Sequence, residues 1–266
     1  MPRITFRHNP ARVLPLIAAA ILLSLVALPL FAVALRGLPE FATAVAGAEV
    51  RSAVTLTAWT SAVALLVILL LGTPTAWLIA RRRSRAWRIL DAIIDLPIVL
   101  PPAVAGLGLL LAFGRNGLLA PLLQPLGIQL AFSTTAVVIA QIFVAAPLYV
   151  RAAVSGFRSV DRDLERVAMV EGAGPWQIFR FITLPLALPS LAAGAVTAWA
   201  RSLGEFGATI FFAGNLPGRT QTMALAIYSS FQSDLPAALA LTLLLLLTSL
   251  AVLVAARRLH THSDQG

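Results

Sequence analysis

The sequence contains no cysteine and no lysine. The lack of cysteine excludes disulfides, thiolate metal sites and a cysteine nucleophile. The lack of lysine excludes a P-loop, which needs a lysine to reach the nucleotide phosphates, so any ATP hydrolysis must occur on another subunit. The only histidines, His8, His260 and His262, lie near the termini, which excludes a buried histidine ligand set. Signature motifs of hydrolases, zinc proteases and dinucleotide-binding enzymes are also absent. We therefore predict no catalytic residues, no metal site and no cofactor.

Charge is scarce as well. Only 12% of the 266 residues are charged, whereas 59% are hydrophobic, and a soluble domain averages about 25% charged residues. Such a chain cannot cover its apolar surface in water, which predicts an all-α, polytopic membrane helix bundle in a lipid bilayer. The net charge of +9 comes from arginines that lie mostly in short connections between apolar runs. This placement favours a role in membrane topology over binding to nucleic acid.

Six apolar stretches have the roughly 20 residues that a membrane span needs. They predict one transmembrane domain over residues 1–266, with about six transmembrane helices at Val13–Leu35, Val54–Ala80, Ile93–Phe113, Phe132–Val150, Leu186–Phe212 and Leu235–Ala256. The first stretch follows three arginines and could be read as a signal peptide. Its apolar core is longer than the hydrophobic region of a signal peptide, which favours an uncleaved helix.

The arginines predict the orientation of the chain. With the N-terminus placed inside, most of them fall in inside segments: Arg3, Arg7, Arg12, Arg81, Arg82, Arg83, Arg85, Arg88, Arg151, Arg158, Arg162, Arg166, Arg180, Arg257 and Arg258. The outside loops hold only Arg36, Arg51, Arg115 and Arg219. The positive-inside rule therefore places both termini in the cytoplasm.

Two spans contain residues that suit a translocation path or gate, and these are Asp95, Pro97, Pro101, Pro102, Arg201 and Glu205. Proline removes a backbone donor and bends a helix, and three prolines beside an acidic residue favour a helix that bends around a pathway. Arg201 and Glu205 are four residues apart, and charges in the bilayer must be paired or face water. One hypothesis is that Arg201 contacts a passing anion. We prefer a structural ion pair near the gate, since a tight cationic site would hold an anion rather than release it.

The segment Arg151–Thr183 on the inside is longer than a connection between bundled helices requires. Its apolar residues near Leu164 and Val167 have helical spacing, and Gly172, Gly174 and Pro175 are typical of a helix end. The pattern therefore predicts a short amphipathic helix. It could lie on the membrane surface, but its four acidic residues are unfavourable next to anionic lipid. A docking surface for a partner fits better.

The same segment resembles a loop of the permeases of binding-protein-dependent ABC importers. In that family a glycine is followed after nine residues by Ile-x-Leu-Pro, and here Gly172 precedes Ile182-Thr183-Leu184-Pro185 at that spacing. The family's Glu-Ala-Ala triplet falls on Arg166-Val167-Ala168, and Glu165 stands one position earlier. The resemblance implies an ATPase-coupling loop at about residues 151–185, formed by Leu164, Glu165, Val167, Ala168, Glu171, Gly172, Ala173, Gly174, Pro175, Ile182, Leu184 and Pro185.

Within this family, three segments resemble molybdate permeases: Asp95–Pro102, Ala200–Thr209 and Gly214–Thr222. The second is similar in sulfate and tungstate permeases, so sulfate, thiosulfate and tungstate remain alternative substrates. The resemblance implies cytoplasmic ATPase subunits, an extracytoplasmic oxyanion-binding protein and a second permease copy as partners, in a bacterial inner membrane. An autonomous secondary transporter or channel is a competing interpretation. A membrane enzyme is disfavoured, since no cluster of catalytic groups occurs.

Overall fold

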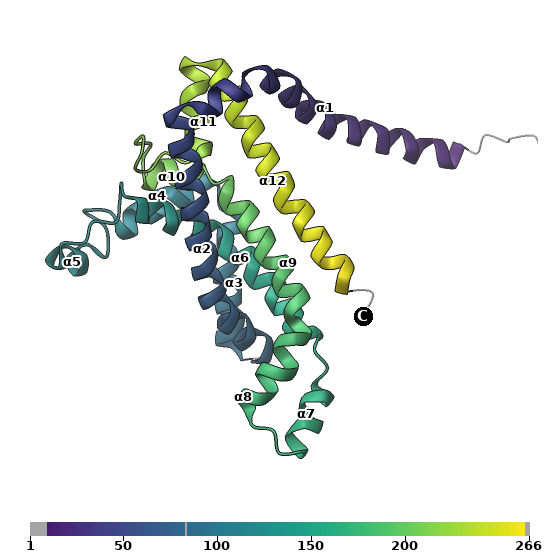
Figure 1. Ribbon diagram of the computed structural model, residues 1–266. Coiled ribbons are helices and arrows are strands. Elements are labelled where there is room, and N and C mark those ends of the chain that lie inside the picture. Colours follow the sequence, from purple (N-terminus) through teal and green to yellow (C-terminus); the bar gives the residue numbers. More distant parts are fainter. Residues whose placement is uncertain (1–9, 83, 264–266) are drawn as a thin grey trace, which may run out of the picture.

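The computed structural model describes residues 10–82 and 84–263, and these residues form helices and connecting loops, with no strand among them (Figure 1). The helices that position the candidate site are α2 (Ala48–Arg81), α3 (Arg85–Val99), α4 (Pro102–Phe113), α6 (Thr134–Ser159), α7 (Arg162–Val170), α9 (Leu184–Leu203) and α10 (Gly207–Phe212). The others are α1 (Pro10–Ala46), α5 (Ala120–Leu123), η1 (Gln124–Leu126), α8 (Pro175–Ile178), the π-helical segment η2 (Phe179–Thr183), α11 (Met223–Ser233) and α12 (Leu235–Ser263).

Five helices of the described chain are long and apolar enough to cross a membrane. They are Leu14–Ala42 within α1, all of α2 and α6, the continuous run Pro175–Leu203, and Leu235–Val254 within α12. The pair α3 and α4 adds a sixth span if the two helices are counted as one broken span. The prediction of an all-α membrane bundle with about six spans is confirmed.

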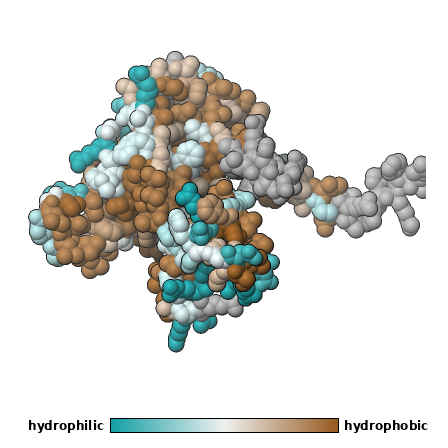
Figure 2. Space-filling view, turned by 60° about the horizontal axis from the view of Figure 1, so that its bottom comes forward, coloured by the Kyte–Doolittle hydropathy of each residue, from teal (hydrophilic) through white to brown (hydrophobic). Residues whose placement is uncertain are grey.

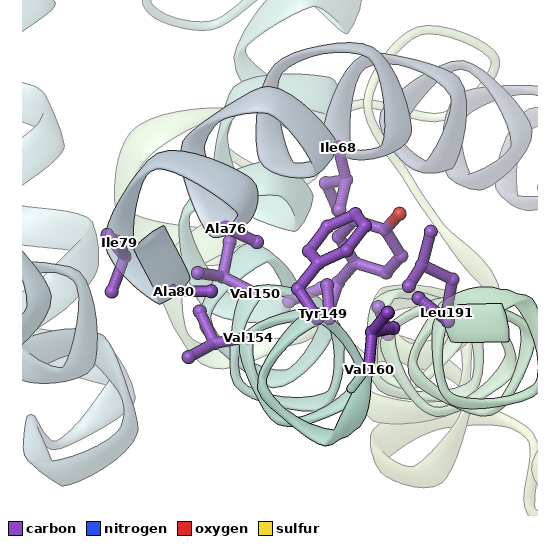
Figure 3. Packing of buried hydrophobic residues seen from close by; sticks show 14 residues of the cluster. Ile68, Ala76, Ile79, Ala80, Tyr149, Val150, Val154, Val160 and Leu191 are labelled. Atoms are coloured by element: carbon purple, nitrogen blue, oxygen red, sulfur yellow. The ribbon is translucent and has the colours of Figure 1, made fainter. Parts of the chain in front are cut away.

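The packed centre of the molecule lies between α2, α6 and α9. Figure 3 shows the ring of Tyr149 on α6 reaching between Ile68 of α2 and Leu191 of α9. The Tyr149 hydroxyl lies 2.6 Å from the hydroxyl of Thr73 on α2, so the one polar atom of this ring has a partner. Helices surrounded by lipid have no hydrophobic drive to associate and depend on such close packing and interhelical hydrogen bonds.

Glycines allow this close approach. A Cβ atom added to Gly72 of α2 would lie 2.8 Å from the Tyr149 ring, and one added to Gly194 of α9 would lie 2.6 Å from the Ala152 Cβ. A larger side chain at either position would push the helices apart, as is usual where small residues line a helix contact in a membrane.

Two predicted spans differ from the structure. The third was predicted as Ile93–Phe113, and it is divided into α3 and α4, which meet at an angle of 119°. The bend expected from the prolines is present, at Leu100 and Pro101 between the two helices. The fifth was predicted as Leu186–Phe212, but its helix ends at Leu203 and α10 is separate. Glu205 lies between α9 and α10, and its carboxylate accepts a hydrogen bond from the Ala208 N–H in the first turn of α10. The prediction missed this break because hydropathy does not reveal such a contact.

Helix α1 leaves the bundle. Figure 1 shows it running outward from the end of the molecule where α11 and the start of α12 lie. None of its most apolar 18-residue window is buried. Its contact with α12 is near its own C-terminal end, where a Cβ on Gly37 would lie 2.9 Å from the Leu239 carbonyl oxygen. Most of α1 therefore presents hydrophobic side chains that lipid or another chain must cover.

Candidate functional site

Helix α7 is a short, well-delimited element in the long connection between α6 and α9. Its first turn is capped by Asp161, whose carboxylate accepts a hydrogen bond of 2.9 Å from the Asp163 backbone N–H. Its last turn is closed by Gly172 with φ +89°, which lets the Ala173 N–H donate to the Ala168 carbonyl at 2.9 Å. This left-handed position favours glycine. The amphipathic helix predicted from the sequence is thus α7, and Gly172 ends it.

The largely buried carboxylate of Glu165 connects α7 to the bundle. Glu165 Oε1 accepts a hydrogen bond from Arg81 at the C-terminal end of α2, and a second, of 2.5 Å, from the Thr183 hydroxyl at the end of η2. The Arg81 and Glu165 side chains are only 16% and 18% exposed. Charge-assisted hydrogen bonds shielded from water are among the stronger polar contacts in proteins. Glu165 therefore fixes α7 to two spans at once.

Helix α7 and the start of the next span also expose large apolar side chains. They are Leu164, Val167, Met169, Val170, Trp176 and Phe181. Figure 2 shows the lobe at the bottom of the view as mixed, with hydrophilic residues gathered around hydrophobic ones. Exposed apolar groups with a polar rim are typical of a protein-binding surface. We call these six residues the docking face.

The remaining predicted loop residues lie where α7 connects to α9. The Gly174 N–H donates to the Gln177 side chain at 2.8 Å, and Pro175 opens α8. Ile182 lies in the π-helical segment, and Leu184 and Pro185 begin α9. Helices α8, η2 and α9 run as one continuous helix from Pro175 to Leu203, so the loop is joined to the fifth span without a break. π-helical turns of this kind are frequent at functional sites.

Asp95 lies on α3 and pairs with α6. Arg151 of α6 donates to its carboxylate and also lies 3.3 Å from Asp91, one turn earlier on α3. Arg151 thus holds two acidic residues of α3 against α6. Pro97 follows in the same helix, and Pro101 precedes the bend.

Helix α4 packs closely on α10 beyond the bend. A Cβ on Gly207 would overlap the Pro102 side chain, and a Cβ on Gly106 would lie 2.6 Å from the Ala208 carbonyl oxygen. This contact brings Pro102 next to the segment that carries Glu205. The structure therefore joins Pro102 with the Arg201–Glu205 region and leaves Asp95 paired with α6.

Arg201 and Glu205 form an ion pair at the end of α9. Arg201 Nη1 lies 2.8 Å from Glu205 Oε2, and Glu205 is only 1% exposed. The geometry of this contact is that of an ion pair without a hydrogen bond. Glu205 Oε1 accepts the Ala208 N–H at 2.8 Å. The preferred hypothesis of pairing agrees with this geometry, although the two residues do not share a helix as expected.

Buried polar groups surround this pair. Gln141 of α6 donates to the Ser202 carbonyl at 3.3 Å, while its own side-chain oxygen and the Thr209 hydroxyl have no hydrogen-bond partner among the described residues. Sequence reasoning missed Gln141, Arg81 and Thr183, since each meets its partner through a tertiary contact, and it missed Thr209, which no local pattern marks. Asp91 could have been found, because it precedes Asp95 by one helical turn.

Comparison with known proteins identifies the family. Residues 72–266 match the family described as binding-protein-dependent transport system inner membrane component. The molybdenum transport system permease protein ModB of Mycobacterium tuberculosis is 44% identical over 242 residues, which cover 91% of this chain and 90% of the relative. The ModB protein of Escherichia coli K12 is 44% identical over 182 residues, which cover 68% of this chain and 80% of the relative.

Solved structures confirm the fold. A bacterial ABC transporter that imports the polysaccharide alginate contains a chain with a TM-score of 0.75 and 18% identity, which matches 95% of this chain and 94% of that one. A chain of the MetNI methionine ABC transporter in an inward-facing conformation gives a TM-score of 0.62 at 18% identity, over 79% of this chain and 94% of that one.

A transport system of this kind couples its membrane component to an ATPase and receives its substrate from a binding protein. The chain is a multi-pass inner membrane protein and the permease subunit of such a system, not its ATPase. With its helices, its loop around Gly172 and its close relatives in agreement, the chain belongs to the family of binding-protein-dependent transport system inner membrane components.

Proposed function

We propose that this chain forms the translocation pathway of an ATP-driven importer for molybdate. The observation that carries the proposal is the combination of two features of this loop: Glu165 is bound to Arg81 and Thr183, and the docking face beside it is exposed. The relatives that match most of this chain are molybdenum transport permeases, which supports molybdate as the substrate. Tungstate and sulfate share its tetrahedral oxyanion chemistry and are the substrates to be tested against it.

In this proposal the docking face sits in a groove of the cytoplasmic ATPase. When the ATPase subunits close on ATP, they displace α7, and Glu165 transmits the displacement to the end of α2 and to Thr183 within the α8–α9 helix. The bundle then changes between two packed arrangements, as transporters that switch between discrete states do. The predicted residues Leu164, Glu165, Val167, Ala168, Glu171, Gly172, Ala173 and Gly174 act here as one mechanical unit.

A second copy of the chain completes the pore. The apolar window of α1 is fully uncovered, and α3 has no buried residue along its whole length. Two copies related by a twofold axis would cover such surfaces reciprocally, as in most symmetric oligomers. With both termini in the cytoplasm, each copy presents its α7 to one ATPase subunit.

The gate lies where α4, α10 and the end of α9 meet. The ion pair of Arg201 with Glu205 holds the start of α10, and the close fit of Gly207 on Pro102 aligns α10 with the bent third span. A change in this contact would open or close the path beside the bend. Asp95 and Arg151 keep α3 fixed to α6 while it does so.

The test is ATP-dependent uptake of radiolabelled molybdate into proteoliposomes. The vesicles contain this permease and its ATPase, with the binding protein added outside and ATP enclosed. We expect uptake that requires all components and that excess tungstate suppresses more strongly than sulfate does. Uptake by the permease alone would contradict the proposal and favour a secondary transporter. Uptake of sulfate with no uptake of molybdate would keep the ABC mechanism and replace the substrate.

A further inference from the structure

A cavity of about 670 Å³ opens between the connection that follows α4 and the loop that precedes α11. Both segments belong to the loops that the arginine distribution places outside. The two loops are held together by the Thr134 hydroxyl, which donates to the Arg219 carbonyl at 2.8 Å, and by the Phe132 N–H, which donates to the Phe212 carbonyl at 3.1 Å. The cavity is therefore built by tertiary contacts.

Two arginines, one from each loop, line this cavity. Arg115 follows α4, and Arg219 lies between α10 and α11. Both are exposed, and within the described part of the chain neither forms an ion pair. No acidic residue lines the cavity. The site thus offers two uncompensated positive charges to an anionic partner.

The rest of the lining combines apolar residues with Gln124 and Gln129, and one of its residues is strained. Phe132 has φ +58°, the only positive φ of a non-glycine residue in the described chain, and its side chain remains 51% exposed. A bulky residue in the left-handed region costs free energy and is typically retained at a binding site. Leu216 and Ile128 are exposed beside it. Exposed aromatic and aliphatic side chains next to arginines are typical of a protein interface.

The volume of the cavity distinguishes between its possible occupants. Pockets that bind drug-sized molecules have volumes of about 300–1,000 Å³, and this cavity lies in that range. A single four-oxygen anion would therefore leave most of the cavity empty and its apolar residues uncovered. A protruding protein segment with a carboxylate side chain next to apolar ones would fill the cavity and also cover its apolar residues. We propose that this cavity is where an acidic projection of the extracytoplasmic binding protein docks, with Arg115 and Arg219 pairing its carboxylates and Phe132 packing on its apolar part. This inference rests on the proposed function, because it takes the loops to be extracytoplasmic.

The experiment measures binding of the purified, molybdate-loaded binding protein to the permease–ATPase complex in lipid nanodiscs. We expect Arg115→Ala and Arg219→Ala each to weaken binding about three- to tenfold, and the double charge reversal Arg115→Glu/Arg219→Glu to weaken it about a hundredfold or more. The salt dependence of binding should become shallower in each variant. Arg51→Ala is the matched control, since it removes an outer arginine that does not line the cavity, and it should bind like the original chain.

Basal ATPase activity reports whether each variant is folded and assembled, and Arg115→Lys/Arg219→Lys keeps both charges and should retain most of the affinity. Unchanged binding by the two alanine variants overturns the inference, while uptake of molybdate by the intact system leaves the proposed function standing. The inference is also overturned if free molybdate, without binding protein, binds the original complex and loses that binding in Arg115→Ala or Arg219→Ala. In that case the occupant is the oxyanion.

Discussion

Glu165 and Arg81, which are 84 residues apart in the sequence, join α7 to the end of α2. The carboxylate that stands next to the family's Glu-Ala-Ala position therefore contacts the bundle, while the large apolar side chains of α7 are exposed. In the proposed function this arrangement gives α7 two roles, because Glu165 holds two spans and the exposed apolar side chains are available to a partner.

Removing this carboxylate should uncouple the transporter. We expect Glu165→Ala to leave the Arg81 guanidinium largely shielded and unpaired, at a local cost of about 1–3 kcal/mol, and to lower ATP-dependent uptake at least about tenfold. ATPase activity should then continue without transport. Arg158→Ala removes a neighbouring inside arginine that has no ion pair in the described chain, and it should transport normally. Equal loss in both variants would show that the contact between Glu165 and Arg81 has no special role in transport.

The turn at Gly172 gives a second prediction. A Cβ at this position meets no atom within 4 Å, so Gly172→Ala is strained only by its φ of +89°, a cost of about 1–2 kcal/mol. We expect this cost to shift the docking face and reduce both ATPase retention on washed membranes and uptake.

Gly174→Ala is the control for this turn. Gly174 has a φ of −73°, and an added Cβ would meet only the end of the Gln177 side chain, at 3.6 Å. It should behave like the original chain, and a Gly172→Ala variant that did the same would remove the turn from the coupling account.

Glu205 has two partners, Arg201 and the Ala208 N–H, and the contribution of each contact can be measured separately. Glu205→Gln removes the negative charge that pairs with Arg201 but keeps an oxygen for the Ala208 N–H, whereas Glu205→Ala loses both. We expect the thermal unfolding temperature of the purified protein to fall in the order original, Gln, Ala. The swap Arg201→Glu/Glu205→Arg should not restore transport, because arginine cannot accept the Ala208 hydrogen bond. Full recovery in the swap would mean that the charge pair alone matters.

The clamp of Arg151 on α3 is a further target. Arg151→Ala leaves Asp91 and Asp95 one turn apart without their shared cation, and like charges at this spacing repel each other. We expect faster unfolding and a substrate leak without ATP, measured as molybdate efflux from loaded vesicles. Arg151→Lys should recover part of the loss, since it restores the charge without the fork geometry. If vesicles containing Arg151→Ala retain their molybdate without ATP, the pairing of Arg151 with Asp91 and Asp95 is not needed to keep the gate closed.

The sequence was sufficient for the features that local pattern determines. Apolar runs predicted the long helices, the prolines predicted the bend before Pro102, and the spacing from Gly172 to Pro185 predicted the loop and its family. The angle of 119° was not predictable, because it depends on how α4 packs on α10 through Gly106 and Gly207.

Tertiary partners were beyond the sequence as well. Nothing local marks Arg81 or Thr183 as partners of Glu165, or Arg151 as the partner of Asp95, and Arg151 was counted only as an inside charge. The span containing Glu205 was drawn too long because hydropathy does not register a carboxylate that caps the following helix. Such contacts become visible only when segments distant in the sequence are brought together.

Cross-linking to the ATPase tests the central claim most directly, and this chain has no native cysteine that would form a competing cross-link. Val170 at the end of α7 is 86% exposed, and Leu118 in the predicted outer connection is 85% exposed. The account predicts that Val170→Cys forms a cross-link to a cysteine in the ATPase groove, that this bond blocks uptake, and that Leu118→Cys forms none. If Val170→Cys is instead labelled by an impermeant thiol reagent on intact cells, α7 lies outside and the coupling account is contradicted.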